Sequence, residues 1–192
     1  MKYDFIDSLR GFAIMGAVAV HAREWIVPSS SLLRDLASAG SHGVQLFFVV
    51  SAFTLLEEQE TYDLLLTIDV FEHVPDYLGF LKSLRSRAEM KVFHIPLDLS
   101  VSSVLRPQSF LRVRRDVGHL HYFSQETAIA ALEDCGYQIL DAPLTAGALE
   151  VAGKYGTTRT RLANFPRRIF GSISQRWAAR ILGGWSLLVL AK

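Results

Sequence analysis

The 192-residue sequence contains one cysteine, Cys135, so it can form neither a disulfide within the chain nor a CxxC metal site. It contains no acidic residue after Glu150, although eight lysines and arginines follow that position. A block of one charge predicts a solvated face or an anionic partner. Because cysteine pairs are absent, we expect a cytosolic compartment or the cytoplasmic side of a membrane.

Long hydrophobic runs are also absent. Residues 11–20 and 43–56 form apolar runs of ten and fourteen residues, shorter than the roughly 20 residues that span a bilayer. The first ten residues carry two acids against two bases, so the basic start of a secretory signal is missing. Half of the residues are nevertheless hydrophobic, which indicates either membrane contact or an unusually apolar core.

Strand-like and helix-like segments alternate from residue 62 onward. Residues 75–87 have apolar side chains at helical spacing. A second helix is predicted between Ser124, a suitable N-cap, and Gly136. The alternation predicts an α/β fold with a mostly parallel sheet. Four strands are predicted, over residues 62–70, 90–97, 138–143 and 185–191.

The segment between the second strand and the second helix has no such pattern. Residues 99–118, LSVSSVLRPQSFLRVRRDVG, form a long irregular insert. Loops of this length inside a compact domain are usually functional lids or disordered. We therefore expect a lid or a disordered segment here.

Four segments, taken in order, resemble the C-terminal half of class I S-adenosylmethionine-dependent methyltransferases. The resemblance implies an α/β fold with an incomplete Rossmann-like sheet of about four strands, the last pair antiparallel. It also implies methyl transfer from S-adenosylmethionine to a small-molecule or lipid-linked acceptor. The segments are YDLLLTIDVFEHVPD at 62–76, FHIPLDL at 93–99, GHLHYFSQETAIAALEDCGY at 118–137 and GGWSLLVLAK at 183–192.

The same resemblance indicates which parts of the family pattern are not found in these residues. In the family, a G-x-G loop after the first strand and an acid after the second strand hold the cofactor. The 192 residues contain no G-x-G, and the matching segments begin at the fourth strand. We therefore expect weak or no methyl transfer by this chain alone. A second chain that completes the sheet is a candidate partner.

The motif D-x-x-E-H follows the first predicted strand, with Asp69, Glu72 and His73. It is similar to an E-x-x-E-H cluster that binds a divalent cation in some small-molecule O-methyltransferases, with Asp69 replacing the first Glu. The three residues are therefore candidate ligands for Mg²⁺ or Zn²⁺. Asp69 is also a candidate cofactor contact, and Glu72 and His73 are candidate catalytic residues, His73 as a general base. Alternatively, Glu72 and His73 cap the helix and hydrogen-bond a neighbouring loop.

Other histidines have different predicted roles. His119, His121 and Tyr122 are candidate substrate contacts, because the resemblance implies that their loop closes over substrate. The two histidines would face one side if the segment is extended. His94 lies within an apolar strand and is predicted to be a core histidine.

The basic C-terminal region predicts an amphipathic helix. Its apolar positions are spaced by four, as on one face of an interfacial helix. An ordinary helix that covers the sheet is the alternative. Nucleic-acid binding is not predicted, because the basic residues lack interleaved aromatic side chains. The apolar positions are Ile169, Ile173, Trp177 and Ile181.

The first 56 residues resemble a different family, the membrane acyltransferase-3 proteins. IDSLRGFAIMGAVAVHA at 6–22 and GVQLFFVVSAFTL at 43–55 are similar to its first two helices. The resemblance implies that His21 is catalytic in acyl transfer and that Arg10 supports it.

The chain is therefore predicted to have three parts. Residues 1–56 form an acyltransferase-3-like segment of two hydrophobic helices, 57–61 a junction, and 62–192 a methyltransferase-like half. Three functions follow: methyl transfer, acyl transfer, or a non-catalytic module in contact with a membrane.

Overall fold

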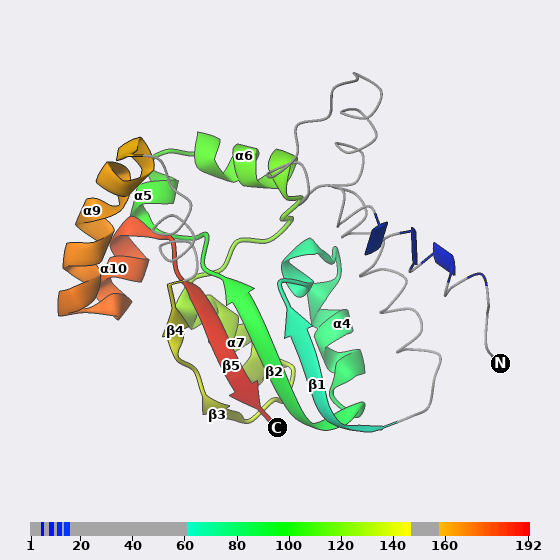
Figure 1. The fold of residues 1–192 in the computed structure, drawn as a ribbon. Coiled ribbons are helices and arrows are strands. Elements are labelled where there is room, and N and C mark those ends of the chain that lie inside the picture. Colours follow the sequence, from blue (N-terminus) through cyan, green and yellow to red (C-terminus); the bar gives the residue numbers. More distant parts are fainter. Residues whose placement is uncertain (1–4, 6–7, 10, 13, 16–60, 147–157) are drawn as a thin grey trace. The chain divides into compact units, whose positions relative to one another are not determined.

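The computed structural model describes residues 5, 8, 9, 11, 12, 14, 15, 61–146 and 158–192, with 158–161 and 163 described by their backbone alone (Figure 1). The chain divides into two compact units, Met1–Glu60 and Thr61–Lys192. The two hydrophobic helices expected within residues 1–56 lie almost wholly outside the described residues, as does nearly all of the 57–61 junction. No helix in the described part is long and apolar enough to cross a membrane.

The second unit is an α/β fold around a mixed sheet of five described strands (Figure 1). Their order is β1-β2-β5-β3, and β4 also pairs with β5. β1 is parallel to β2, whereas β5 is antiparallel to β2, β3 and β4. The strands are β1 (Tyr62–Ile68), β2 (Ala88–Pro96), β3 (Ile139–Asp141), β4 (Leu144–Thr145) and β5 (Ser186–Ala191).

The predicted α/β class is confirmed, and two details of the sheet differ from the prediction. The short strand β4 was not anticipated, so the described sheet has five strands rather than about four. The expectation of a mostly parallel sheet is wrong for the described strands. Because β5 inserts between β2 and β3, three of the four pairings are antiparallel.

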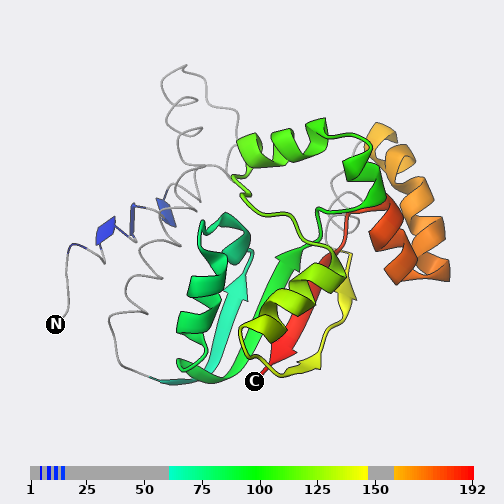
Figure 2. The same cartoon turned by 180° about the vertical axis from the view of Figure 1, so that it is seen from behind.

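Two helices cover one face of this sheet, as Figure 2 shows: α4 (Tyr77–Leu84) and α7 (Gln125–Asp134). The N-cap of α4 is Asp76, whose side chain accepts a hydrogen bond from the Gly79 amide. Ser124 caps α7 as predicted. The covered face forms the main core, which includes Leu81, Phe93, Ile95, Leu132, Leu187 and Val189.

No described helix of the second unit lies over the other face of the sheet (Figure 1). Side chains alternate between the two faces of a strand, so Leu64, Leu66 and Ile68 point away from the core. All three are exposed, and Leu66 is the most exposed at 61%. β1 therefore has one closed face and one open face.

The insert after β2 is helical rather than irregular. It contains α5 (Val101–Val104) and α6 (Gln108–Asp116), so the prediction of an irregular segment is wrong. Ser100 starts α5 with a capping box, in which its side chain accepts a hydrogen bond from the Ser103 amide. The serines that resembled loop sequence therefore act as a helix cap.

The basic C-terminal region forms two helices instead of one. α9 (Thr158–Ile173) ends just before Ser174, which has extended backbone and caps α10 (Gln175–Leu182). The prediction of a single apolar stripe is therefore wrong, because the chain changes direction between Ile173 and Trp177. Both of these side chains are exposed.

Candidate functional site

The candidate site lies at the carboxyl ends of the two parallel strands. β1 is followed by Asp69 and by a short 3-10 helix, η1 (Phe71–His73). β2 is followed closely by Asp98, which lies two residues beyond the strand. Because parallel strands end at the same edge, these residues come together where open α/β sheets bind ligands.

Glu72 is the most unusual side chain of this region. Its residue is 1% exposed, and neither carboxylate oxygen has a hydrogen-bond partner among the described residues. Burial, followed by the charges of Asp69 and Asp98, raises the pKa of Glu72 from 4.5 to about 8. A buried carboxyl group without a hydrogen-bond partner is costly, which makes Glu72 a candidate contact for a polar guest.

Two histidines face this carboxyl group. His73 Nδ1 lies 3.1 Å from the Gly118 carbonyl, which can only accept, so Nδ1 carries the proton and donates it. His73 Nε2 is 3.9 Å from Glu72 Oε1. Burial lowers the pKa of His73, so its imidazole is neutral at neutral pH.

His119 completes the group. Its Nδ1 donates to Asp98 Oδ2 at 2.6 Å, which leaves Nε2 free of this hydrogen bond. The ring centroids of His119 and His73 are 4.8 Å apart, with the edge of one ring against the face of the other. We call Glu72, His73 and His119 the buried cluster, and Asp98 supports it from outside.

The buried cluster can hold a small polar guest. Its three ligand atoms all lie within 4.8 Å of one another. Two imidazole nitrogens and one carboxylate oxygen match the ligands of zinc and similar ions. The Asp98–His119 hydrogen bond resembles the outer contact that orients metal-binding histidines. The same groups could receive a proton from an acceptor hydroxyl or amine.

The structure brings together a different set of residues from the one that the D-x-x-E-H motif predicted. Asp69 has φ +50° and its Oδ1 accepts from His94 Nδ1 at 2.7 Å, so it is engaged outside the buried cluster. His119 stands in the place that the predicted ligand set gave to Asp69. His94 has a partner, as a core histidine would, but its side chain lies on the open face and is partly exposed.

The two other candidates of this loop, His121 and Tyr122, form hydrogen bonds to backbone carbonyls. His121 Nε2 donates to the Val74 carbonyl at 3.0 Å, and the Tyr122 hydroxyl donates to the Phe110 carbonyl at 3.0 Å. The Glu72 carbonyl accepts from the amides of Leu120 and His121. The alternative that Glu72 and His73 bind a neighbouring loop therefore describes part of their contacts. Arg10 and His21, the acyltransferase candidates, lie outside the described residues.

Sequence reasoning missed Asp98 and the role of its partner His119. The position of Asp98 just after a predicted strand was the available signal, because that strand was expected to be parallel to its neighbour. The pairing itself joins residues 21 positions apart, across the helical insert. No local spacing rule covers such a pair.

The described residues do not fit the adenosine part of S-adenosylmethionine. A cofactor loop needs glycines that open onto space, whereas the adjacent pair Gly183 and Gly184 faces side chains. A Cβ atom at Gly183 would lie 2.8 Å from Ser100 Oγ, and one at Gly184 would lie 3.2 Å from Arg167 Nε. These glycines, with φ of +65° and +91°, allow close packing and form no cofactor cradle.

Comparison with known proteins finds one matching family model. A family model described as a methyltransferase domain matches residues 15–142, about two thirds of the chain. No curated protein matches the sequence. A solved structure of a protein assigned as a sarcosine dimethylglycine methyltransferase, from Galdieria sulphuraria, is similar with 16% identity and a TM-score of 0.43. The alignment covers 71% of this chain and 56% of that one, so this chain spans little more than half of that protein's length.

Proposed function

This chain belongs to the methyltransferase domain family, and we propose that it binds the acceptor in methyl transfer from S-adenosylmethionine to a small-molecule or lipid-linked acceptor. The family uses this cofactor as methyl donor. The observation that carries the proposal is the buried cluster at the carboxyl ends of β1 and β2, with the unpartnered Glu72 carboxyl group at its centre.

His119 is the proposed base. An acceptor hydroxyl or amine must release a proton when it gains a methyl group, so a base within reach of that atom assists the reaction. Asp98 holds His119 by its Nδ1 and so directs the basic Nε2 away from itself. Asp98 also stabilises the imidazolium that forms when His119 takes the proton.

Glu72 is the proposed hydrogen-bond donor to the acceptor. With its pKa raised to about 8, the carboxyl group is largely protonated at neutral pH. A protonated carboxyl group can donate to the acceptor atom, whereas a carboxylate can only accept. Glu72 would thereby orient the acceptor against His119.

A divalent cation is the alternative guest of the same cluster. The unpartnered carboxyl group of Glu72 and the Asp98–His119 contact support it. A cation would require Glu72 to be ionised, so cation binding and proton donation by Glu72 exclude each other.

The proposed catalytic role is tested with two matched variants. Transfer of a radiolabelled methyl group to a small-molecule cell extract would be measured for the wild type, His119→Gln and His94→Gln, with the cofactor at about 10 mM because its binding to this chain is expected to be weak. We expect His119→Gln to lower transfer by about 10²- to 10⁴-fold. His94→Gln also breaks an Asp–His hydrogen bond and should change transfer by less than about threefold. Equal transfer by wild type and His119→Gln would refute the role of His119.

Cofactor affinity tests the other half of the proposal. We expect the purified chain to bind S-adenosylmethionine with a Kd above about 1 mM, because the 192 residues contain no G-x-G loop. Calorimetric titration measures this directly. A micromolar Kd would contradict the conclusion that these residues do not fit the cofactor.

Two contacts of the chain are proposed alongside. A second chain that supplies a further strand would pair with β1, which stands at the end of the described sheet and exposes Leu66. Exposed Ile173 and Trp177, beside the arginines of α9 and α10, support contact with the cytoplasmic side of a membrane. Co-sedimentation of the full chain with anionic vesicles, lost on Trp177→Ala, tests the second contact.

A further inference from the structure

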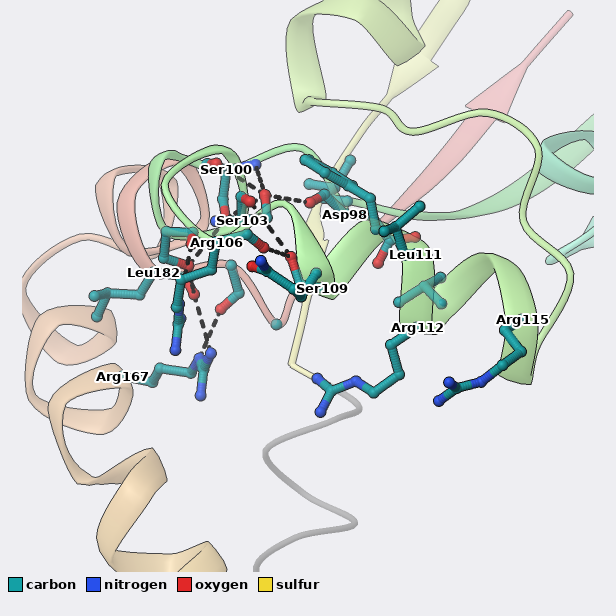
Figure 3. Close-up of a pocket in the computed structure, with 17 residues that line it drawn as sticks. Asp98, Ser100, Ser103, Arg106, Ser109, Leu111, Arg112, Arg115, Arg167 and Leu182 are labelled. Atoms are coloured by element: carbon teal, nitrogen blue, oxygen red, sulfur yellow. Dashed lines mark hydrogen bonds between the residues drawn. The ribbon is translucent and has the colours of Figure 1, made fainter.

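We propose that the acceptor carries a phosphate group, which binds to the arginines of a cleft beside the buried cluster. This inference rests on the proposed function and names the class of its acceptor. The cleft has a volume of about 850 Å³ (Figure 3), within the range of small-molecule sites. Asp98 lines the cleft and also binds His119, so the cleft and the buried cluster share a wall.

The charge of the cleft is strongly one-sided. Four arginines line it and only one acid, Asp98, does so. That acid already accepts a hydrogen bond from His119. The arginines are Arg106, Arg112, Arg115 and Arg167.

Three of these arginines have no carboxylate partner among the residues that the structure describes. Arg115 pairs with Asp116 at 2.9 Å. Within the described ranges, Arg106, Arg112 and Arg167 form no ion pair. Uncompensated positive charges gathered around one cleft attract an anion and are stabilised by it.

Arg167 is the clearest case because it is half-buried. It donates to the carbonyls of Gly183 and Leu182 at 2.9 and 3.1 Å and to Asn164 Oδ1 at 2.8 Å, and all three acceptors are neutral. Burial and the charge of Arg106 lower the pKa of Arg167. Two of its five N–H groups are left over by these three bonds. A bound anion would supply both the missing charge and the missing acceptors.

The walls of the cleft are fixed by neighbouring bonds. The Ser102 hydroxyl donates to the Leu182 carbonyl at 2.9 Å and so ties α5 to the end of α10. Gly184 lets the backbone approach the guanidinium of Arg167, where a Cβ atom would crowd Nε. The arginine is therefore held in place before any ligand arrives, which lowers the entropy cost of binding.

Phosphate fits this arrangement better than other ligands do. Guanidinium groups bind phosphate through two parallel hydrogen bonds, and a phosphate ester carries enough charge to pair with several arginines. Three of the four lining serines, Ser102, Ser103 and Ser109, donate their hydroxyl protons to backbone carbonyls, so the arginines are the main donors. Phosphate could come from a soluble ester or from a lipid headgroup, which matches the two acceptor classes of the proposed function.

The test compares two arginines of the same helix. Arg112 lines the cleft, whereas Arg114 on α6 is exposed and does not. Binding of sn-glycerol 3-phosphate to the full chain would be measured by calorimetry, with glycerol as the uncharged control. We expect Arg112→Gln to weaken binding by about tenfold or more and Arg114→Gln to leave it unchanged. Arg167→Gln is less suitable, because Arg167 also holds the backbone of Gly183.

A second arm distinguishes the source of the phosphate. Vesicles of phosphatidylcholine with and without phosphatidic acid would be sedimented with each variant. Binding to phosphatidic acid that is lost in Arg112→Gln, without binding of glycerol 3-phosphate, assigns the site to a lipid phosphate. Binding through α9 and α10 alone would persist in Arg112→Gln. The inference is overturned if neither probe binds, or if Arg112→Gln and Arg114→Gln behave alike.

The outcome is separable from that of the proposed function. His119→Gln should leave phosphate binding intact, because His119 does not line the cleft. Phosphate binding together with unaffected methyl transfer in His119→Gln would refute the base and keep the phosphate site. If phosphate does not bind but His119→Gln loses methyl transfer, the role of His119 as base is kept and the phosphate site is refuted.

Discussion

Two aspartate–histidine pairs stand at the carboxyl ends of β1 and β2, and their hydrogen bonds have nearly the same length. His119 Nδ1 lies 2.6 Å from Asp98 Oδ2, and His94 Nδ1 lies 2.7 Å from Asp69 Oδ1. Their surroundings differ. The side chains of the first pair are 26% and 10% exposed, against 47% and 25% for the second.

The neighbours of the two histidines differ more than their bonds do. His119 lies against His73 and the unpartnered Glu72, in the buried cluster. His94 lies on the open face, with the Thr145 hydroxyl 3.4 Å from its Nε2. A short Asp–His hydrogen bond therefore does not define a site by itself. A buried neighbouring carboxyl group without a hydrogen-bond partner, such as Glu72, does define one. The Asp69–His94 pair has no such neighbour among the described residues and therefore serves as a control for the Asp98–His119 pair.

The largest expected difference between the pairs concerns activity. Asp98→Asn removes the charge that orients His119 and stabilises its protonated form, so methyl transfer should fall by about 10²-fold or more. Asp69→Asn removes the same charge from His94 and should change transfer by less than about threefold. Both variants would be assayed over pH 6 to 9. An equal loss in the two variants would remove the distinction between the pairs.

The next effect concerns stability and pH. In the folded chain Glu72 keeps its proton up to about pH 8, whereas in the unfolded chain it releases it near 4.5. Between these values the folded chain holds one more proton, so the free energy of unfolding falls as pH rises, by at most about 5 kcal/mol. Glu72→Gln should remove this decline.

Urea unfolding at several pH values between 4.5 and 8.5, with EDTA present, measures the decline. Asp69→Asn is the control and should keep most of it, because Asp69 raises the pKa of Glu72 less than burial does. A wild type whose stability rises over this range would contradict the protonated state assigned to Glu72.

The sequence predicted local features well. The apolar runs located β1 and β2 to within two residues, and the Ser124 cap was correct. These features depend on neighbouring residues, which a sequence displays directly. The cap at Ser174 was of the same kind, but the regular spacing of isoleucines around it favoured one continuous helix.

The site was only half predictable for the opposite reason. Glu72 and His73 were found because they follow a strand and belong to a motif that resembles a cation-binding cluster. The support of His119 by Asp98 depends on how the insert of α5 and α6 returns the chain to the end of β2. The burial that leaves Glu72 without a partner is likewise a property of the packed fold, and no spacing of residues encodes it.

Metal binding separates the predicted ligand set from the one that the structure assembles. If a cation occupies the buried cluster, His119→Ala should weaken zinc binding by about 100-fold or more, because it removes a ligand. Asp69→Asn should leave the zinc Kd within about threefold, although Asp69 belongs to the D-x-x-E-H motif. Competition with a chromophoric chelator measures both values. Loss of binding in Asp69→Asn alone would restore the motif set, and a wild type without zinc affinity would leave the acceptor as the guest.

The smallest expected effect concerns the open face on which His94 lies. Leu66 is 61% exposed, so Leu66→Ala removes little buried area and should lower the free energy of unfolding of the purified chain by less than about 1 kcal/mol. Leu81 on α4 is fully buried, and Leu81→Ala should cost about 2–5 kcal/mol because it leaves a cavity. Chemical denaturation of both variants measures the difference. A cost at Leu66 as large as that at Leu81 would mean that another strand or chain covers the open face in solution, and the exposure that separates His94 from His119 would then no longer hold.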